Sequence, residues 1–315
     1  MSLDKNLIEN LIDITSHAAI SCYPHLGKGN KILADKAATD VMRYNLNKLN
    51  IDAEVVIGEG ELDEAPMLYI GEKLGNTKGK KIDIAVDPVE GTNFVAKNLP
   101  GAISVLAISE KGNLFKAPET YMNKIAFGQN IPNGVIDLDN TIEKNIKNLS
   151  DYKNKKIKDI TVCLLDRERH FEVISSIKKV GAKVKLITDG DVAGALLVSD
   201  KKYNVDIFVG IGGGPEGVIA ASALDAMNCN FQGRFIFETD KDKVRAKQMG
   251  IKDLNKKYQI NEIVKGDSIF CATGITSGDL INGLKKDGSN FHTETLITHK
   301  SENLVSIIHK KYLSK

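Results

Sequence analysis

The sequence has no long apolar run, no strong charge of one sign and no paired cysteine motif. No apolar stretch approaches the roughly 20 residues that a membrane-spanning helix needs. The 43 basic and 41 acidic residues leave a formal net charge of only +2. This near balance argues against nucleic acid or a membrane surface as the main partner.

The four cysteines do not indicate a metal site or a disulfide framework. Cys22, Cys163, Cys229 and Cys271 are far apart and form no CxxC pair, which argues against a zinc ribbon and a disulfide scaffold. The first turns mix acidic and amide residues and lack the apolar core of a signal peptide. We therefore expect a protein of the reducing cytoplasm.

The chain is long enough for two domains or one large layered unit, with 315 residues, 42% hydrophobic and 27% charged,. A polar, lysine-rich segment at 138–158 marks a possible boundary, after which strands and helices alternate regularly. No internal repeat is present. The patterns predict helices at 3–17, 31–49 (capped by Asn30), 66–74 and 170–180, and strands at 53–57, 82–87, 102–109, 114–117, 160–165, 183–187, 205–209, 235–237 and 268–272.

The segment from Asp87 to Thr92 carries the most information. The apolar run Ile82–Val86 predicts a buried strand of a parallel sheet, and Pro88 predicts a turn at its end because proline cannot continue a central strand. Asp87, Glu90 and Thr92 then lie together at a carboxyl-terminal strand edge, where open α/β sheets bind ligands. Carboxylates this close repel each other unless a cation or a proton lies between them. The segment indicates a hard-metal site beside a hydroxyl that orients a nucleophile.

Other acids extend this prediction. Oxygen ligands without histidine suit Mg²⁺ or Mn²⁺ and fit zinc poorly. Asp63, in an acidic and glycine-containing loop, is placed to accept a hydrogen bond from Thr92 and complete a relay to water. Asp35 alone is better explained as a solvated helix residue. The candidate ligands at element edges and glycine-rich turns are Asp35, Glu59, Asp87, Glu90 and Glu216.

The glycine run 212–217 leaves two readings open. It matches GxGxxG after a strand, with Glu238 about 20 residues further on, which is the outline of a dinucleotide-binding fingerprint. Against this, Glu216 would place a carboxylate beside the pyrophosphate, and Pro215 removes one N–H donor. A loop that gives amides to a sugar phosphate, with Glu216 on a metal, uses the same residues without conflict.

Two arginines and three polar residues are candidates for substrate contacts. Arg167 and Arg169 follow a predicted strand, and arginine forks bind phosphate bidentately, although surface arginines near a helix start are equally common. Tyr121, Asp189 and Asp191 are able to hydrogen-bond sugar hydroxyls, but this pattern alone is weak.

These segments, taken in order, resemble the class II fructose-1,6-bisphosphatases of bacteria, within the lithium-sensitive sugar phosphatase superfamily. The resemblance covers nearly the whole chain. Glutamate at position 90, where the wider superfamily has aspartate, is typical of the class II enzymes. The matching segments are Lys31–Asp35, Val56–Met67, Val86–Thr92, Leu165–Arg167, Asp189–Ala195, Gly210–Gly217 and Ala272–Thr276.

The resemblance implies a layered α/β/α/β/α sandwich. Residues 1–150 would form an N-terminal metal-binding α/β domain and residues 151–315 a C-terminal sugar-phosphate domain, with the site at their junction. The implied reaction is hydrolysis of the 1-phosphate of D-fructose 1,6-bisphosphate to fructose 6-phosphate, in gluconeogenesis. It implies two or more Mn²⁺ or Mg²⁺ ions per site and a cytoplasmic homo-oligomer, a dimer or a tetramer. Sedoheptulose 1,7-bisphosphate or an inositol phosphate remains an alternative substrate.

The resemblance also implies residue roles. Asp35 and Glu59 would hold one metal, and Asp87, Glu90 and Glu216 the other. Thr92, oriented by Asp63, would position the water, and Lys31 would contact the scissile phosphate. Two positions depart from the family pattern, Glu168 where proline is frequent and Gly214 where alanine is usual. The implied substrate-binding residues are Glu90, Gly91, Thr92, Tyr121, Arg167, Glu168, Arg169, Asp189, Gly190, Asp191 and Gly213.

Overall fold

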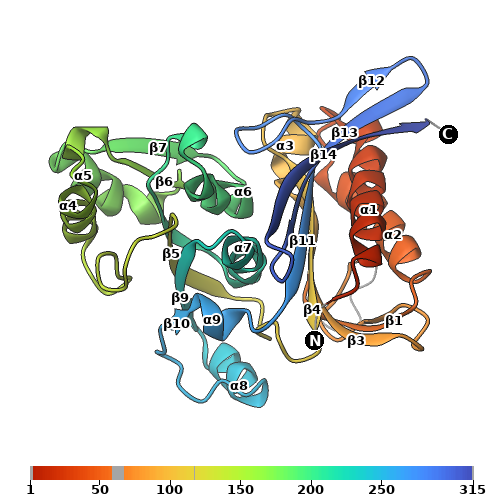
Figure 1. Ribbon diagram of the computed structural model, residues 1–315, viewed down its shortest axis with the longest axis horizontal. Coiled ribbons are helices and arrows are strands. Elements are labelled where there is room, and N and C mark those ends of the chain that lie inside the picture. Colours follow the sequence, from red (N-terminus) through yellow and green to blue (C-terminus); the bar gives the residue numbers. More distant parts are fainter. Residues whose placement is uncertain (1–2, 59–66, 117, 314–315) are drawn as a thin grey trace. The chain divides into compact units, whose positions relative to one another are not determined.

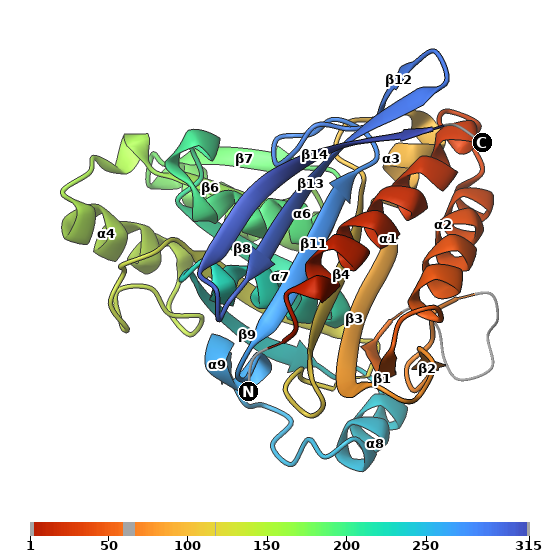
Figure 2. The same cartoon turned by 45° about the vertical axis from the view of Figure 1, so that its right-hand side comes forward.

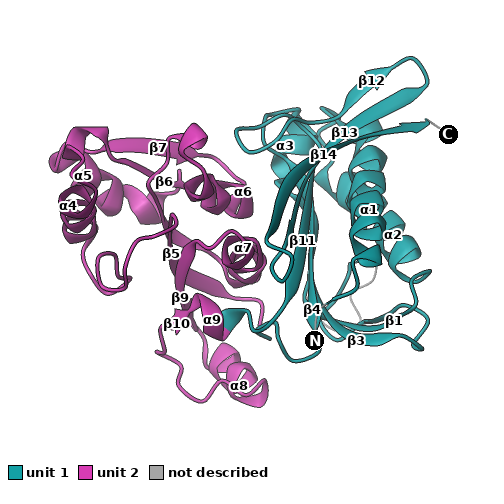
Figure 3. Cartoon of the chain, in the orientation of Figure 1, with its two compact units in different colours: residues 1–116, 263–315 teal, residues 117–262 magenta. Residues whose placement is uncertain are grey.

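The computed structural model describes residues 3–58, 67–116 and 118–313. The chain divides into two compact units, unit 1 with residues 1–116 and 263–315 and unit 2 with residues 117–262 (Figure 3). This division differs from the predicted boundary at residue 150. The lysine-rich segment is helix α4 (Ile142–Lys153), which buries Ile146 and Leu149 inside unit 2. After Glu262 the chain returns to unit 1.

Unit 1 is a sheet covered by helices on one face (Figures 1 and 2). Its strands, within the described residues, follow the order β12-β13-β11-β4-β3-β1-β2, with β14 paired to β13. Among the described strands of this sheet, only β1 and β3 pair in parallel. The elements are α1 (Asn6–Cys22), the 3-10 helix η1 (Tyr23–His25), α2 (Lys31–Leu46), β1 (Ile51–Ile57), β2 (Lys73–Leu74), β3 (Lys80–Glu90), α3 (Thr92–Lys97), β4 (Ile103–Glu110), β11 (Ser268–Gly274), β12 (Lys285–Asp287), β13 (Asn290–His299) and β14 (Leu304–Leu313).

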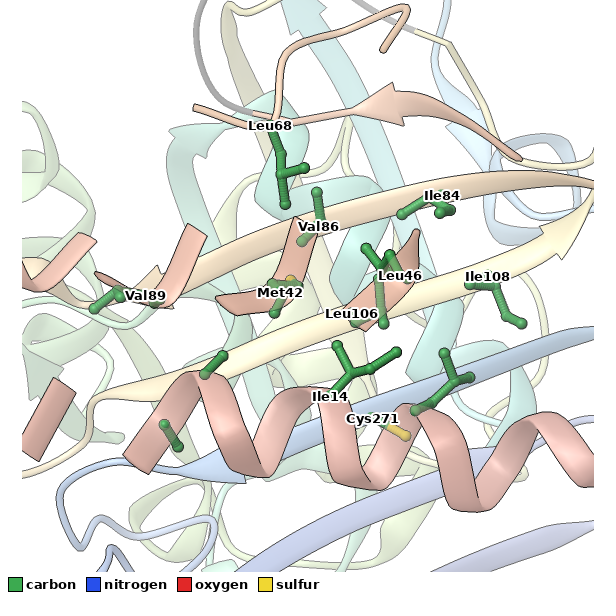
Figure 4. Close-up of a cluster of buried hydrophobic side chains, with 14 of the residues drawn as sticks. Ile14, Met42, Leu46, Leu68, Ile84, Val86, Val89, Leu106, Ile108 and Cys271 are labelled. Atoms are coloured by element: carbon green, nitrogen blue, oxygen red, sulfur yellow. The ribbon is translucent and has the colours of Figure 1, made fainter. Parts of the chain in front are cut away.

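The core of unit 1 lies between this sheet and helices α1 and α2 (Figure 4). Helix α1 buries Leu11, Ile14, Ala18 and Cys22 at the three- and four-residue spacing of one helix face,. Ile82, Ile84 and Val86 of β3 belong to the same buried cluster. The core fixes the frame from which β3 and α2 present their polar residues.

The amino-terminal segment of unit 1 is held by a buried carboxylate. Asp267 accepts hydrogen bonds from the Leu3 amide at 2.7 Å, from the Ser301 amide and hydroxyl at 3.0 Å each, and from His299 Nε2 at 3.0 Å. Burial raises the pKa of Asp267, but these hydrogen bonds outweigh burial and the pKa is lowered. The stabilisation is therefore complete above the unfolded-state pKa of 3.8 and is lost as the pH falls below it,.

We expect Asp267→Asn to lower the stability of the protein by about 1–3 kcal/mol at neutral pH, because an amide replaces an oxygen that accepts several hydrogen bonds. The urea denaturation midpoint is the measurement. The conservative Ser301→Ala, which removes one donor and leaves the carboxylate, should cost less. An unchanged midpoint for Asp267→Asn would show that this cluster does not stabilise the fold.

Unit 2 is built around a second sheet. Its strand order is β10-β9-β5-β8-β6-β7, and β6 runs parallel to both β7 and β8. The elements are β5 (Tyr121–Phe127), α4 (Ile142–Lys153), η2 (Ile157–Asp159), β6 (Thr161–Leu165), η3 (Glu168–His170), α5 (Phe171–Lys179), β7 (Lys183–Ile187), α6 (Asp191–Leu196), η4 (Leu197–Ser199), η5 (Lys201–Tyr203), β8 (Ile207–Gly213), α7 (Gly214–Ala226), β9 (Asn230–Ile236), α8 (Asp240–Gln248), β10 (Tyr258–Gln259) and α9 (Ile260–Ile263).

Both faces of the second sheet are covered. Ile125 and Phe127 of β5 pack in one cluster with α4 and α5, while Met122, on the opposite face of the same strand, lies against α7 at Gly217,. Unit 1 thus supplies a helix layer and a sheet, and unit 2 a sheet between two helix layers. The α/β class predicted from the sequence is confirmed.

Several predicted elements differ from the structure. Strand β3 does not end at Pro88 but continues to Glu90. The described part of the segment predicted as a helix at 66–74 forms turns and the short β2, and the strand predicted near 114 is only an isolated pairing of Leu114 with Val264. The hairpin of β13 and β14 was not predicted. No helix in the described ranges is long and apolar enough to cross a membrane.

Candidate active site

A bulge in β3 brings two predicted metal ligands to one face of the first sheet. Asp87 lies opposite Val105 of β4, and Glu90 lies opposite Ile103, so three steps along β3 match two along β4. Val105 and Ile103 are two residues apart and share a face, so their partners Asp87 and Glu90 share a face as well. A regular strand would have placed these two carboxylates on opposite faces.

The bulge explains how the strand can contain Pro88 without ending there. Pro88 has no N–H to offer the ladder, and a bulge is a place where no donor is needed. The Val89 amide donates instead to the Asp87 carboxylate at 3.0 Å. The carboxylates of Asp87 and Glu90 are both buried, with 9% and 3% of the residue exposed. The predicted turn is therefore a bulge, and it still places both acids at the end of the strand.

The residues that follow the bulge start a short helix. Gly91 has φ 88°, in the left-handed region, and caps α3. A Cβ at Gly91 would lie 2.8 Å from the Phe94 ring, so only glycine fits there,. Thr92 is then the first residue of α3 and is half-buried. The hydroxyl directly follows two acids at the end of a strand, as the sequence predicted, whereas helix α3 was not predicted.

Helix α2 positions two more predicted residues. The Asn30 side chain accepts from the Leu33 amide at 3.1 Å, which confirms the predicted cap,. Lys31 is the exposed first residue of α2, and Asp35 is buried one turn later, with 9% exposed. Burial raises the pKa of the neighbouring Cys22 thiol to about 12, and the Asp35 charge adds to this rise. Cys22 therefore stays protonated and is a poor metal ligand.

The predicted ligand set as a whole stays a prediction. Glu59 and Asp63 lie outside the described residues. Asp35, Asp87 and Glu90 belong to unit 1 and Glu216 to unit 2. Among the residues that the structure describes, no group of three or more His, Cys, Asp and Glu side chains is placed to hold a metal ion. The donor chemistry does fit a hard cation, because every predicted ligand is a carboxylate.

In unit 2, the glycine run makes room for two carboxylates. A Cβ on Gly212 would lie 2.1 Å from the Asp191 carboxylate, and a Cβ on Gly213 would lie 1.8 Å from the Glu216 carboxylate. Strand β8 runs to Gly213, and α7 begins at once with Glu216 in its first turn. Burial raises the pKa of Glu216, the Lys124 ammonium opposes this, and Asp191 adds to it.

Lys124 was not predicted as a functional residue, yet it carries a charge and is only 1% exposed. Its ammonium forms an ion pair with Asp191 and donates to the Gly213 carbonyl oxygen at 2.7 Å. Both partners are predicted substrate-binding residues. A lysine inside the apolar strand Met122–Phe127 was the available clue, but this strand was not predicted.

The two arginines are held by backbone carbonyls near the glycine run. Arg167 donates to the Thr188 carbonyl at 2.6 Å and lies 3.8 Å from Asp189. Arg169 donates to the Ile211 carbonyl at 2.9 Å, and its guanidinium lies 5.2 Å from the Tyr121 ring centre. Tyr121 in turn pairs with Gly213 across β5 and β8. The structure thus brings together the predicted Tyr121, Arg169 and Gly213.

The remaining predicted positions in this region are also placed. Gly190 has φ 84° and caps α6, which begins at Asp191. Glu168, where the family often has proline, is exposed at the start of η3. Its charge faces solvent. Gly214 has no room for the usual alanine here, because a Cβ would lie 2.8 Å from Phe235 and 2.9 Å from the Thr120 carbonyl.

His170 is a second residue that the sequence analysis missed. Its Nδ1 lies 2.8 Å from the Leu165 carbonyl oxygen, and its Nε2 accepts from the Ile211 amide at 2.8 Å. Because a carbonyl only accepts, Nδ1 carries the proton and the ring is neutral. Burial lowers the pKa of His170, the Leu165 carbonyl opposes this, and the Arg169 charge adds to the lowering. The ring fixes Ile211 next to the glycine run.

The stability of the fold against denaturation should depend on pH through the His170 imidazole. With a folded-state pKa below the unfolded value of 6.5, the stabilisation is complete above that pH and is lost as the pH falls,. We expect the denaturation midpoint to fall between about pH 7.5 and about pH 5.5, and to fall less in His170→Gln. Replacing the exposed His292 is the control and should leave the wild-type slope. Equal slopes for wild type and His170→Gln would contradict this assignment.

Acidic residues at a strand end before a helix-starting threonine, and arginines beside a glycine run, are features of enzymes that act on phosphate esters. The family model described as bacterial fructose-1,6-bisphosphatase, glpX-encoded, matches residues 5–312. The chain belongs to this family of phosphoric monoester hydrolases.

The relatives agree. A class 2 fructose-1,6-bisphosphatase of Haemophilus influenzae is 43% identical over 315 residues, covering 95% of this chain and 94% of the relative. A Synechococcus protein named D-fructose 1,6-bisphosphatase class 2/sedoheptulose 1,7-bisphosphatase is 39% identical, covering 97% and 95%. The solved structure of an extragenic suppressor from Pyrococcus furiosus is 16% identical and covers 61% of this chain and 70% of that one, with a TM-score of 0.33. That structural likeness is too slight to carry an argument.

Proposed function

We propose that this protein hydrolyses the 1-phosphate of D-fructose 1,6-bisphosphate, yielding fructose 6-phosphate and phosphate, with Mn²⁺ or Mg²⁺ as its cofactor. The observation that carries the proposal is the β3 bulge, which sets Asp87 and Glu90 on one face directly before Thr92. The family supplies the substrate, since the Haemophilus influenzae relative is named a fructose-1,6-bisphosphatase.

The residues of unit 1 take the reacting end of the substrate. The acids Asp35, Glu59, Asp87 and Glu90 would hold the divalent ions, and the family resemblance adds Glu216 of unit 2 as a further ligand. Such ions supply positive charge that polarises a phosphoryl oxygen and lowers the pKa of water. Thr92, oriented by Asp63, positions the attacking water, and Lys31 offers its ammonium to the scissile phosphate.

The residues of unit 2 take the sugar and the far phosphate. The Arg167 and Arg169 guanidinium groups offer forks to a phosphate, and Tyr121, Asp189 and Asp191 offer hydrogen bonds to sugar hydroxyls. Gly91, Gly190 and the Gly213 backbone complete the proposed set of substrate contacts through their main-chain groups. Glu168, which the resemblance also includes among the substrate contacts, is exposed beside the two arginines.

The dinucleotide alternative fits the structure poorly. The Glu216 carboxylate occupies the space beside Gly213 where a pyrophosphate would need to approach the backbone,. Sedoheptulose 1,7-bisphosphate is the stronger second candidate, because the Synechococcus relative carries that activity in its name. We also propose, on the family resemblance, a cytoplasmic homo-oligomer of two or four chains in gluconeogenesis.

A substrate panel tests these alternatives. Purified protein with Mn²⁺ is offered fructose 1,6-bisphosphate, sedoheptulose 1,7-bisphosphate and inositol 1-phosphate, and the product of each is identified. We expect the highest kcat/KM for fructose 1,6-bisphosphate, with fructose 6-phosphate as the product. A clear preference for inositol phosphate, or NAD binding without a divalent ion, would refute the proposed substrate.

A further inference from the structure

Lys124 is a charged group of unit 2 to which the proposed reaction assigns no role. It lies in the middle of β5 and is 1% exposed. Burying an ammonium is costly unless its N–H groups are paired. Here the pairs are the Asp191 carboxylate and the Gly213 carbonyl oxygen. The Lys124 ammonium therefore contacts Asp191 and Gly213, and the proposed function assigns both of these residues to sugar binding.

The ion pair with Lys124 uses only one of the two carboxylate oxygens of Asp191. Its Oδ2 is taken by Lys124, whereas its Oδ1 is buried and has no hydrogen-bond partner in the part of the chain that the structure describes. A buried carboxylate oxygen without a donor is costly, and it suits a ligand that brings a hydroxyl. Gly212 has no side chain to displace Asp191, since a Cβ there would lie 2.1 Å from Oδ2.

A lysine suits this position, because its compact charge lies on a stem that reaches from the interior of β5 to the Asp191 carboxylate and the Gly213 carbonyl oxygen,.

We propose that Lys124 is a positioning residue for sugar recognition: it holds the Asp191 carboxylate and the Gly213 carbonyl so that Asp191 Oδ1 accepts a hydroxyl of the sugar. This inference rests on the proposed function. Lys124 acts through Asp191 and does not touch the reacting phosphate.

Lys124→Met tests the proposal, because methionine keeps most of the volume and removes the charge. KM for fructose 1,6-bisphosphate and Kd for fructose 6-phosphate should each rise about tenfold or more, which is the worth of one charge-assisted hydrogen bond. The kcat should change by less than about threefold, since the lost interaction is present in ground and transition states alike. Mn²⁺ binding, followed by the EPR signal of free Mn²⁺, should stay close to wild type.

Lys155→Met is the matched control. Lys155 Nζ pairs with the carboxylate of Asp206 at 2.7 Å, and Asp206 is likewise buried, at 8% exposed. This control should lower the thermal midpoint and leave KM and Kd unchanged. If Lys124 only stabilises the unit, Lys124→Met will leave KM and Kd unchanged, as Lys155→Met does. A fall in kcat at constant KM would also overturn the proposal.

A measurement on wild-type protein covers the case in which Lys124→Met does not fold. The ¹⁵N-labelled lysine ammonium groups are observed by NMR, and Lys124 should give a slowly exchanging signal that shifts when fructose 6-phosphate binds. Bound sugar without any such shift would overturn the proposal. If wild-type protein does not hydrolyse fructose 1,6-bisphosphate, the proposed function fails. If it does, and Lys124→Met has wild-type KM and Kd, the Lys124 inference fails alone.

Discussion

Thr92→Ala is expected to lower kcat on fructose 1,6-bisphosphate by about 10²–10⁴, the usual worth of a positioned group in proton transfer. KM should change little, because the hydroxyl acts on the attacking water and not on the bound sugar. The fold should survive, since Thr92 is the half-buried first residue of α3 and Gly91 provides the helix start. Steady-state kinetics with saturating Mn²⁺ is the measurement.

Thr92→Ser is the matched variant, because it keeps the hydroxyl and loses only a methyl group. It should recover most of the lost kcat. If serine is as inactive as alanine, or if alanine loses kcat only together with the thermal midpoint, the hydroxyl does not have the assigned role.

Asp87→Asn or Glu90→Gln is expected to reduce kcat/KM by about 10³ or more and to weaken Mn²⁺ binding, because each removes negative charge from the proposed metal site. The bulge predicts that both variants fail in the same way, since both acids share one face of the sheet. Isothermal titration with Mn²⁺ and phosphate-release kinetics measure the two effects separately.

Asp83→Asn is the control on the same strand. Asp83 is a buried carboxylate of β3 that accepts from the Gly112 amide at 2.6 Å. Its loss should lower stability and leave Mn²⁺ affinity unchanged. Equal loss of Mn²⁺ binding in all three variants would mean that general damage to β3, and not metal ligation, explains the result.

The sequence predicted best those elements whose pattern is local. The strand at 183–187 and the Asn30 cap were predicted as observed, because a short β-branched, alternating segment or a single capping side chain decides each. The order Asp87, Glu90, Thr92 also predicted correctly that these three residues lie together at the end of one strand.

The remaining features depend on partners distant in the sequence. The Pro88 bulge is defined by its register against β4, and a proline alone does not distinguish a bulge from a turn,. The hairpin of β13 and β14 mixes apolar and polar residues without clean alternation, so it became visible only through its pairing with β11. Lys124 looked like a surface lysine because its partner Asp191 lies 67 residues away.

Phosphate release from fructose 1,6-bisphosphate by the purified wild-type protein tests the central claim most directly. The assay is run with Mn²⁺, with Mg²⁺ and with a chelator, and fructose 6-phosphate is identified as the product. The account predicts release with at least one of the two ions and none with the chelator. Release that persists in the chelator, or no release from folded protein with either ion, would contradict it.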